Sequence, residues 1–145
     1  MRTPRITALM VLLALAPITA YSLTVPTIFQ HADVMNVSPD LPAAQGMVKF
    51  AKTDNGNTSI NLMVKYMAEP QKLQPHASVY VAWVRLDKAS PAQNIGALKV
   101  NDHRKGTLKT VTPLREFELF VTAETDSQTQ VPTGQRLIWT NRTTD

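Results

Sequence analysis

Two glutamates, Glu116 and Glu118, have the best spacing in this sequence for acid–base chemistry. They lie two positions apart on a strand-like stretch, so their side chains share one face about 7 Å apart, a separation that glycosidases can use. A catalytic pair also needs a cleft that keeps one of the two carboxyl groups protonated. Because an outward strand face with Lys and Thr neighbours is commonly solvated, we interpret the two glutamates as solvent-exposed residues and predict no catalytic residue.

Three histidines, His31, His76 and His103, are the candidates for a metal site. A zinc site needs three or four converging ligands, commonly in close sequence pairs. The close pairings here are only His31 with Asp33 and Asp102 with His103. All three histidines fall among Pro, Asn and Asp residues, which is typical of loops. We therefore expect solvated histidines and no bound metal.

The remaining catalytic and cofactor motifs are missing from the sequence. It has no cysteine, and no serine lies in a Gly-x-Ser-x-Gly turn of the kind that serine hydrolases use. Its five glycines include no Gly-x-Gly spacing, which disfavours a phosphate-binding loop. We therefore predict that the protein is not an enzyme and needs no cofactor.

The N-terminus has the pattern of a secretory signal peptide. Arg2 and Arg5 precede an uncharged apolar run over residues 6–20. Small residues would permit cleavage after Ala20 or after Ser22. We therefore expect an exported protein, periplasmic or extracellular, with a signal peptide over residues 1–20 or 1–22.

A membrane anchor is the alternative interpretation of the same segment. Residues 6–30 carry no acidic or basic side chain, and about 20 apolar residues suffice to span a bilayer. Pro17, Thr19, Ser22 and Pro26 make the second half of this segment polar and broken, which favours cleavage. An uncleaved chain would instead be anchored by residues 6–29, and only in that case do we expect the membrane as a partner.

The net charge limits the classes of partner, and the cysteine content limits how the domain is stabilised. The net charge of +4 falls to +2 on cleavage, because Arg2 and Arg5 leave with the signal peptide. The other basic residues are scattered among carboxylates and form no stripe with interleaved aromatic residues, so we expect no nucleic-acid partner. Without disulfides, an exported domain of this size must rely on its core and hydrogen bonds.

Period-two alternation of apolar and polar residues dominates the mature chain and predicts strands. The firmest prediction is a hairpin of residues 46–52 and 59–67, joined by a turn containing Asn55 and Gly56. Residues 79–86 are apolar on both alternating faces, which predicts a central strand covered twice. Further strands are expected at residues 94–100, 107–111, 117–124 and 136–140, with an apolar face (Phe117, Leu119, Val121, Ala123) opposite a polar one in residues 117–124.

This spacing predicts an all-β, antiparallel, Ig-like β-sandwich of about seven strands. The domain is expected over residues 46–145, preceded by a lead-in segment over residues 21–45. That segment is either flexible or a first edge strand around Val25 to Phe29.

Aromatic residues can form a sugar-binding platform when they are exposed in a row. Val79 and Val81 share the strand face of Trp83, and Leu137 shares that of Trp139, so we assign both tryptophans to packing. Phe120, on the glutamate-bearing face of its strand, is the better candidate for an exposed contact.

An ordered set of short motifs carries a family resemblance. The set consists of a Trp strand, a Gly strand, a strand ending Val-Thr-Ala-Glu and a Pro-Thr-Gly turn. Its positions are Tyr80, Trp83, Gly96, Leu98, Val121, Thr122, Glu124, Pro132, Thr133 and Gly134. This order resembles the extracytoplasmic C-terminal domain of the anti-sigma-K factor family over about residues 78–140. The resemblance implies a β-sandwich located in the cell envelope, with structural roles for these residues.

The sequence departs from that family in two places. Only five residues precede the apolar run, so we expect no cytoplasmic sigma-binding part, and the Gly-Gly that commonly follows the Val-Thr-x-Glu motif is replaced by Asp126-Ser127-Gln128. We therefore expect a non-catalytic interaction module that binds an envelope protein or a surface partner. A small-ligand or carbohydrate-binding module is the alternative.

Overall fold

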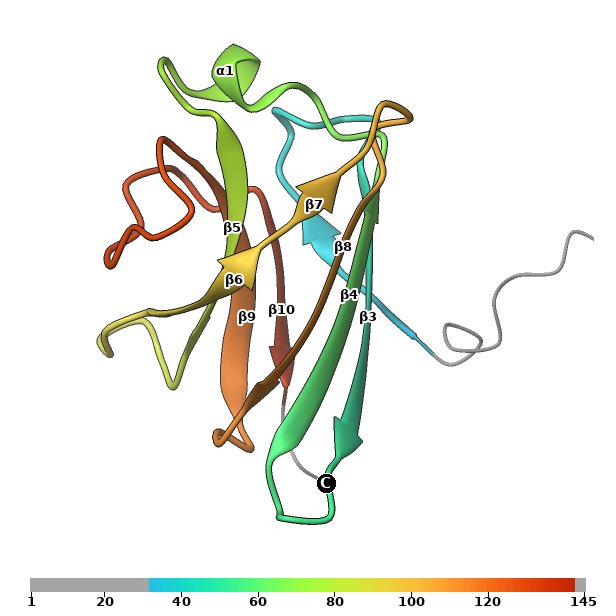
Figure 1. Ribbon diagram of the computed structural model, residues 1–145, viewed down its shortest axis with the longest axis vertical. Helices are drawn as coiled ribbons and strands as arrows, with labels where there is room; N and C mark the ends of the chain where they lie inside the picture. Colours follow the sequence, from blue (N-terminus) through green and yellow to red (C-terminus); the bar gives the residue numbers. More distant parts are fainter. Residues whose placement is uncertain (1–31, 143–145) are drawn as a thin grey trace, which may run out of the picture.

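The computed structural model describes residues 32–142, which form two antiparallel five-stranded sheets packed face to face (Figure 1). Sheet A contains, in spatial order, β1 (Asp33–Val34), β3 (Gln45–Lys52), β4 (Thr58–Lys65), β8 (Gly106–Thr112) and β7 (Lys99–Val100). Sheet B contains β2 (Asn36–Val37), β10 (Ile138–Arg142), β9 (Phe117–Glu124), β5 (Val79–Arg85) and β6 (Gln93–Ala97). One short helix, α1 (Pro70–Leu73), lies at one end.

The order of the longer strands is that of an immunoglobulin-like sandwich. Seven of the described strands have five residues or more. Leaving out β1 and β2 but keeping the two-residue strand β7, the sheets run β3-β4-β8-β7 and β10-β9-β5-β6, which corresponds to the ABED and GFCC′ sheets of that fold. The predicted all-β sandwich is therefore confirmed.

The hairpin of β3 and β4 confirms the firmest sequence prediction. The two strands pair antiparallel over their whole length, from Gln45 opposite Lys65 to Lys52 opposite Thr58. Gly56 closes the turn with a φ of +81°, and its amide donates to the carbonyl of Thr53 at 2.9 Å. A glycine at this position therefore allows a backbone conformation that other residues adopt only with strain.

We expect Gly56→Ala to lower the free energy of unfolding by about 1–2 kcal/mol. The added methyl group has room, since the nearest atom to it would be Arg115 Nη2 at 3.7 Å, so the loss comes from the backbone alone. Urea denaturation at neutral pH measures the change. An unchanged midpoint would show that this turn does not need its positive φ.

The main core lies between the two sheets. Its fully buried side chains include Val48, Ile60 and Leu62 from sheet A and Leu119 and Val121 from sheet B. β5 lies between β9 and β6 with residues 80–84 buried, as its double apolar pattern predicted. β9 is also buried on both faces, so the prediction of a solvated polar face was wrong for this strand.

The predicted strand over residues 94–100 divides between the two sheets. β6 pairs with β5 in sheet B, whereas β7 pairs with β8 in sheet A. Leu98 lies at the crossing, buried in the main core, and its amide donates to the carbonyl of Tyr80 at 2.9 Å. The prediction of one strand was therefore wrong here, and Gly96, with a φ of +128°, lies two residues before the point where the chain leaves sheet B.

Part of the expected lead-in segment contributes to the sheets. β1 pairs with β3, and β2 pairs with β10, so residues 33–37 join one edge of each sheet. The expected signal peptide and the possible strand around Val25 to Phe29 lie outside the described residues. Among the residues that the structure describes, no helix is long and apolar enough to cross a membrane.

Candidate functional site

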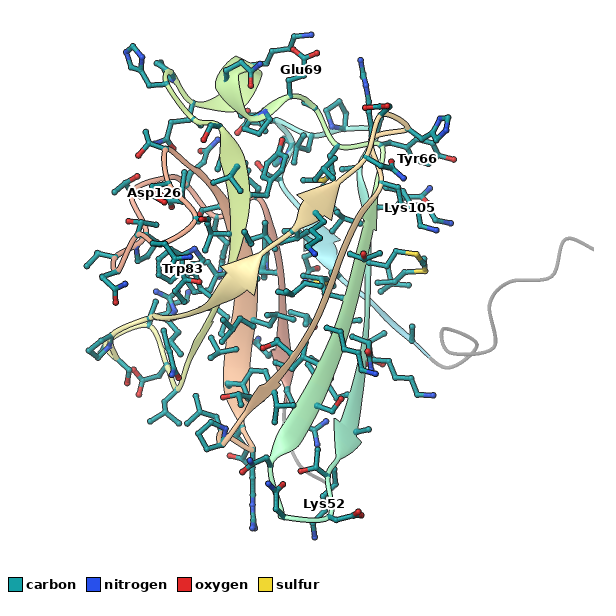
Figure 2. The ribbon with its side chains drawn as sticks, viewed as in Figure 1. Lys52, Tyr66, Glu69, Trp83, Lys105 and Asp126 are labelled. Carbon is teal, nitrogen blue, oxygen red and sulfur yellow. The ribbon has the colours of Figure 1, made fainter. Side chains whose placement is uncertain are left out.

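A second, smaller apolar cluster covers the outer face of sheet B. Val81 and Trp83 from β5 pack with Phe120 from β9, and the Trp83 and Phe120 rings stack with their centroids 6.5 Å apart. Figure 2 shows Trp83 on the side of β5 that carries the loop of Asp126. Only 3% of Phe120 is exposed, so its prediction as an exposed contact was wrong. The Arg85 guanidinium lies 4.8 Å from the centroid of the Phe120 ring.

The loop over residues 125–136 is fastened to sheet B by a buried carboxylate, and we call this contact the Glu124 clamp. Glu124 is 1% exposed and accepts hydrogen bonds from four donor groups. These donors are the Thr122 hydroxyl at 2.5 Å, the Thr133 amide at 3.0 Å, the Thr133 hydroxyl at 2.5 Å and the Gly134 amide at 3.2 Å. Trp83 Nε1 donates in turn to the Thr122 hydroxyl at 2.8 Å, which joins the clamp to the apolar cluster.

Two further contacts hold the same loop. Asn94 of β6 donates from its side-chain amide to the carbonyl of Ser127 at 3.0 Å and of Thr129 at 2.9 Å. At Gly134 the loop passes so close to β9 that an added Cβ would lie 2.5 Å from the Ala123 carbonyl oxygen. This approach explains why a glycine is needed in the Pro-Thr-Gly turn, although its φ is not positive.

A buried ion-pair group lies beside the aromatic cluster. Glu118, 6% exposed, accepts from Arg85 Nε at 2.6 Å and pairs with Arg136 through its other carboxylate oxygen. The Arg136 guanidinium also lies 4.3 Å from the ring centroid of the half-buried Trp139. The interpretation of Glu118 as a solvated residue was therefore wrong, whereas Glu116 is exposed. The signal in the sequence that could have found this group is a pair of opposite charges, Arg85 and Glu118, on two strands that were both expected near the centre of the fold.

The other motif residues lie around this site or in the main core. Tyr80, Leu98 and Val121 are buried in the main core, where their strands meet. Gly96 pairs with Ala82 beside a bulge at Ile95 of β6, where the φ of Gly96 is +128° and its amide donates to Asn94 Oδ1. Pro132 is partly exposed in the 125–136 loop. Five of the ten motif positions (Trp83, Thr122, Glu124, Thr133, Gly134) are thus joined directly through hydrogen bonds.

Tyr80 holds the connection between β4 and β5 in place through a hydrogen bond. Its hydroxyl donates to the carbonyl of Ala68 at 2.7 Å, and burial raises its pKa to about 12. The folded protein therefore holds this proton more tightly than the unfolded chain, in which the pKa is near 10. The resulting stabilisation is complete below pH 10 and is lost as the pH rises through 12.

We expect the wild-type protein to lose about 2 kcal/mol more unfolding free energy between pH 9 and pH 12 than a Tyr80→Phe variant does. All other side chains are the same in the two proteins, so the difference isolates Tyr80. Urea denaturation at several alkaline pH values measures it. Parallel curves for the two proteins would contradict a buried, neutral Tyr80.

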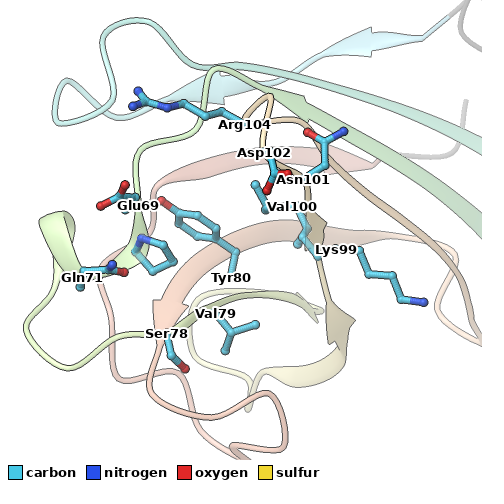
Figure 3. Close-up of a pocket in the computed structure, with 12 residues that line it drawn as sticks. Glu69, Gln71, Ser78, Val79, Tyr80, Lys99, Val100, Asn101, Asp102 and Arg104 are labelled. Carbon is cyan, nitrogen blue, oxygen red and sulfur yellow. The ribbon is translucent and has the colours of Figure 1, made fainter.

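An open groove of about 760 Å³ runs beside α1 and the β7–β8 turn (Figure 3). Its lining includes both signs of charge, from Glu69, Lys99, Asp102 and Arg104, together with the side chains of Gln71 and Asn101. The ring of Tyr80 contributes little surface, because that residue is 1% exposed. The groove is therefore polar and suits a small hydrophilic molecule better than an apolar one.

The histidine positions differ from those of a metal centre. His76 and His103 are exposed in separate loops, and His31 lies outside the described residues. Within residues 32–142, no group of three or more His, Asp or Glu residues is placed to hold a metal ion.

The motif residues on sheet B thus form hydrogen bonds that hold one surface loop, residues 125–136. A comparison of the sequence with models of protein families finds none that matches, and no curated protein is significantly similar to it.

Proposed function

We propose that the protein is an exported, non-catalytic interaction domain of the cell envelope, similar in role to the outer domain that its motifs resemble. The Glu124 clamp is the observation that carries this proposal. A buried carboxylate with four donors holds a polar loop in one conformation at the surface. Because a preformed loop loses little conformational entropy on binding, such a loop suits recognition of a partner.

The surface beside the clamp has features that a protein partner could use. A groove of about 650 Å³ lies between β6 and the 125–136 loop, lined by the amide side chains of Gln93, Gln128 and Gln130. Val131 in the same loop is 67% exposed. β6 is one of the two edge strands of sheet B and pairs with β5 alone, and an edge strand of this kind can pair with a partner strand.

The roles of the buried acids support a non-catalytic function. Glu118 and Glu124 are the buried carboxylates of the described residues, and each has its oxygens occupied by donors from this chain. A general acid or base needs to exchange its proton with a substrate at an accessible position. These two residues instead hold neighbouring side chains and loops in place.

Site-specific photo-crosslinking in the source cells tests this function. A photoreactive amino acid replaces Val131 or Gln128, and the matched control replaces Lys52, which is exposed at the opposite end of the sandwich (Figure 2). We expect a discrete adduct with an envelope component from positions 131 and 128 and none from position 52. If all three positions give the same background, the loop is not an interaction surface.

Small-ligand binding is the second candidate, because the groove beside α1 presents four charged side chains, one from the segment before α1 and three from β7 and the β7–β8 turn. Titration of the labelled protein with monosaccharides, oligosaccharides and amino acids, followed by NMR, tests it. A true ligand shifts the amide signals of Asn101 and Arg104 saturably, and Arg104→Ala weakens its binding. Shifts spread over the whole surface, or none, would count against this role.

A further inference from the structure

The outer face of sheet A carries basic residues without acidic ones. The strand registers place every second residue of β1, β3, β4, β7 and β8 on this face, which Figure 1 shows as one layer. We call this set the lysine face: Val34, Gln45, Met47, Lys49, Ala51, Ser59, Asn61, Met63, Lys65, Lys99, Thr107, Lys109 and Val111. It contains four lysines and no aspartate, glutamate or aromatic residue.

The four lysines are available to an outside partner. Lys99 and Lys109 are exposed, Lys49 and Lys65 are partly exposed, and none forms an ion pair with a described residue. Lys49 and Lys109 flank Asn61 in one cross-strand row, so their attachment points are about 10 Å apart. Lys65 lies four residues from Asn61 along β4, about 13 Å away. The charges are therefore spread in two dimensions and not along a line.

Apolar side chains are interspersed among these charges. Val34 is 81% exposed and Val111 is 51% exposed. Each lies in a cross-strand row that neighbours the row of Lys49 and Lys109. Met63 is 2% exposed although it belongs to neither apolar cluster, so its outward side chain is covered by neighbours on this face. Mixed lysines and exposed aliphatic groups are typical of surfaces that rest on the headgroup region of a bilayer.

Polymeric anions fit this face less well than a membrane does. Proteins that bind single-stranded nucleic acids commonly stack bases on aromatic residues, and the lysine face has none. Of four hollows on the described residues, only one includes a residue of this face, Lys99. A face with so small a share in these hollows complements a planar anionic surface better than it tracks a strand of polymer.

The position of β1 points to the same partner. β1 forms the edge of sheet A, and Val34 lies in the row of Met47 and Met63. The chain that precedes β1 contains the uncharged stretch of residues 6–30. An uncleaved apolar segment would therefore enter the domain at the edge of this face.

We infer that the lysine face docks on an anionic lipid surface. This inference rests on the proposed export of the domain and extends it, because the basic face binds lipid even after the N-terminal segment is removed. Each lysine near an anionic membrane strengthens binding by about fivefold, so four give a moderate, reversible, salt-sensitive association.

Sedimentation with vesicles tests the inference, using the chain that begins at Tyr21 and so contains every described residue. Vesicles of phosphatidylcholine alone are compared with vesicles that contain 30% phosphatidylglycerol, roughly the anionic fraction of a charged leaflet. The face variant carries Lys49→Gln and Lys109→Gln. The matched control carries Lys72→Gln and Lys88→Gln, which remove the same charge from exposed positions elsewhere.

We expect binding to the anionic vesicles only, weakened about 25-fold in the face variant and less than twofold in the control. A salt increase from 0.05 to 0.3 M should release the wild-type protein, since exposed charges are then screened. No binding by a folded protein, or equal loss in face variant and control, overturns the inference. Binding to soluble heparin without vesicle binding overturns it in favour of a polymer.

The two proposals can fail separately. A Val131→Asp variant alters the loop on sheet B and should bind vesicles as the wild type does. Loss of vesicle binding with intact crosslinks at position 131 removes only the lipid inference, whereas vesicle binding without such crosslinks removes only the loop-mediated function.

Discussion

Replacement of Glu124 by alanine should lower the free energy of unfolding by about 3–4 kcal/mol. The variant removes the acceptor of the buried Thr122 hydroxyl and of three partly buried donor groups, the Thr133 amide, the Thr133 hydroxyl and the Gly134 amide. A buried donor that loses its partner costs about 1–3 kcal/mol, although water entering the cavity will satisfy some of the four. Urea denaturation at pH 7 measures the loss.

Two comparison variants sharpen this prediction. Glu124→Gln keeps one oxygen acceptor but places an amide group against donors, so we expect a loss of about 2 kcal/mol. Glu69→Ala removes an exposed carboxylate from a surface pair with Lys72 and should change stability by less than about 0.5 kcal/mol. Hydrogen exchange should become faster first at residues 125–136 in the Glu124 variants. A Glu124→Ala loss below about 1 kcal/mol would show that the clamp does not hold the loop.

Truncation of Trp83 to alanine should have an effect of similar size, about 3–5 kcal/mol. The side chain is 0% exposed, stacks on Phe120 and donates to Thr122. Its loss opens a cavity under the 125–136 loop and removes a donor from the hydrogen-bonded chain that ends at Glu124.

Trp139 provides the matched control for that substitution. It lies on the same sheet face but is half-buried, and it contacts Arg136 through a cation–π interaction. We expect Trp139→Ala to cost about 1–2 kcal/mol, so the two tryptophans should differ clearly in urea midpoints. Equal effects would contradict the assignment of Trp83 to the centre of this cluster.

Local signals in the sequence were enough to predict much of the sandwich. The Asn55-Gly56 turn and the alternation around it determine the β3–β4 hairpin, and the doubly apolar run of residues 79–85 marks a central strand. The change of sheet at Leu98 was not predicted, because the seven residues 94–100 have a suitable length for one strand. Gly96, which has a φ of +128° two residues earlier, was the one local signal that could have marked it. The last strand begins at Ile138, so Leu137 packs in the main core while Trp139 contacts the outer cluster, contrary to the shared face expected.

The site was predicted in its residues but not in its arrangement. The order of motifs singled out Trp83, Thr122, Glu124, Thr133 and Gly134, and the structure joins them. The burial of Glu118 and Phe120 was missed because apolar and polar residues alternate in β9 as they do in a strand with one face exposed to solvent. That face is covered instead by side chains from other segments, among them Arg85, Trp83 and Arg136. Coverage of this kind is not visible in the alternation of β9 itself.

Both proposals depend on export, so the state and location of the N-terminus test the account most directly. The measurement is fractionation of the source cells, followed by mass spectrometry of the purified chain. We predict a chain that begins at Tyr21 or Leu23 in the soluble envelope or secreted fraction. An intact Met1 in the cytosolic fraction would contradict the proposed role in the envelope and, with it, the lipid partner of the lysine face.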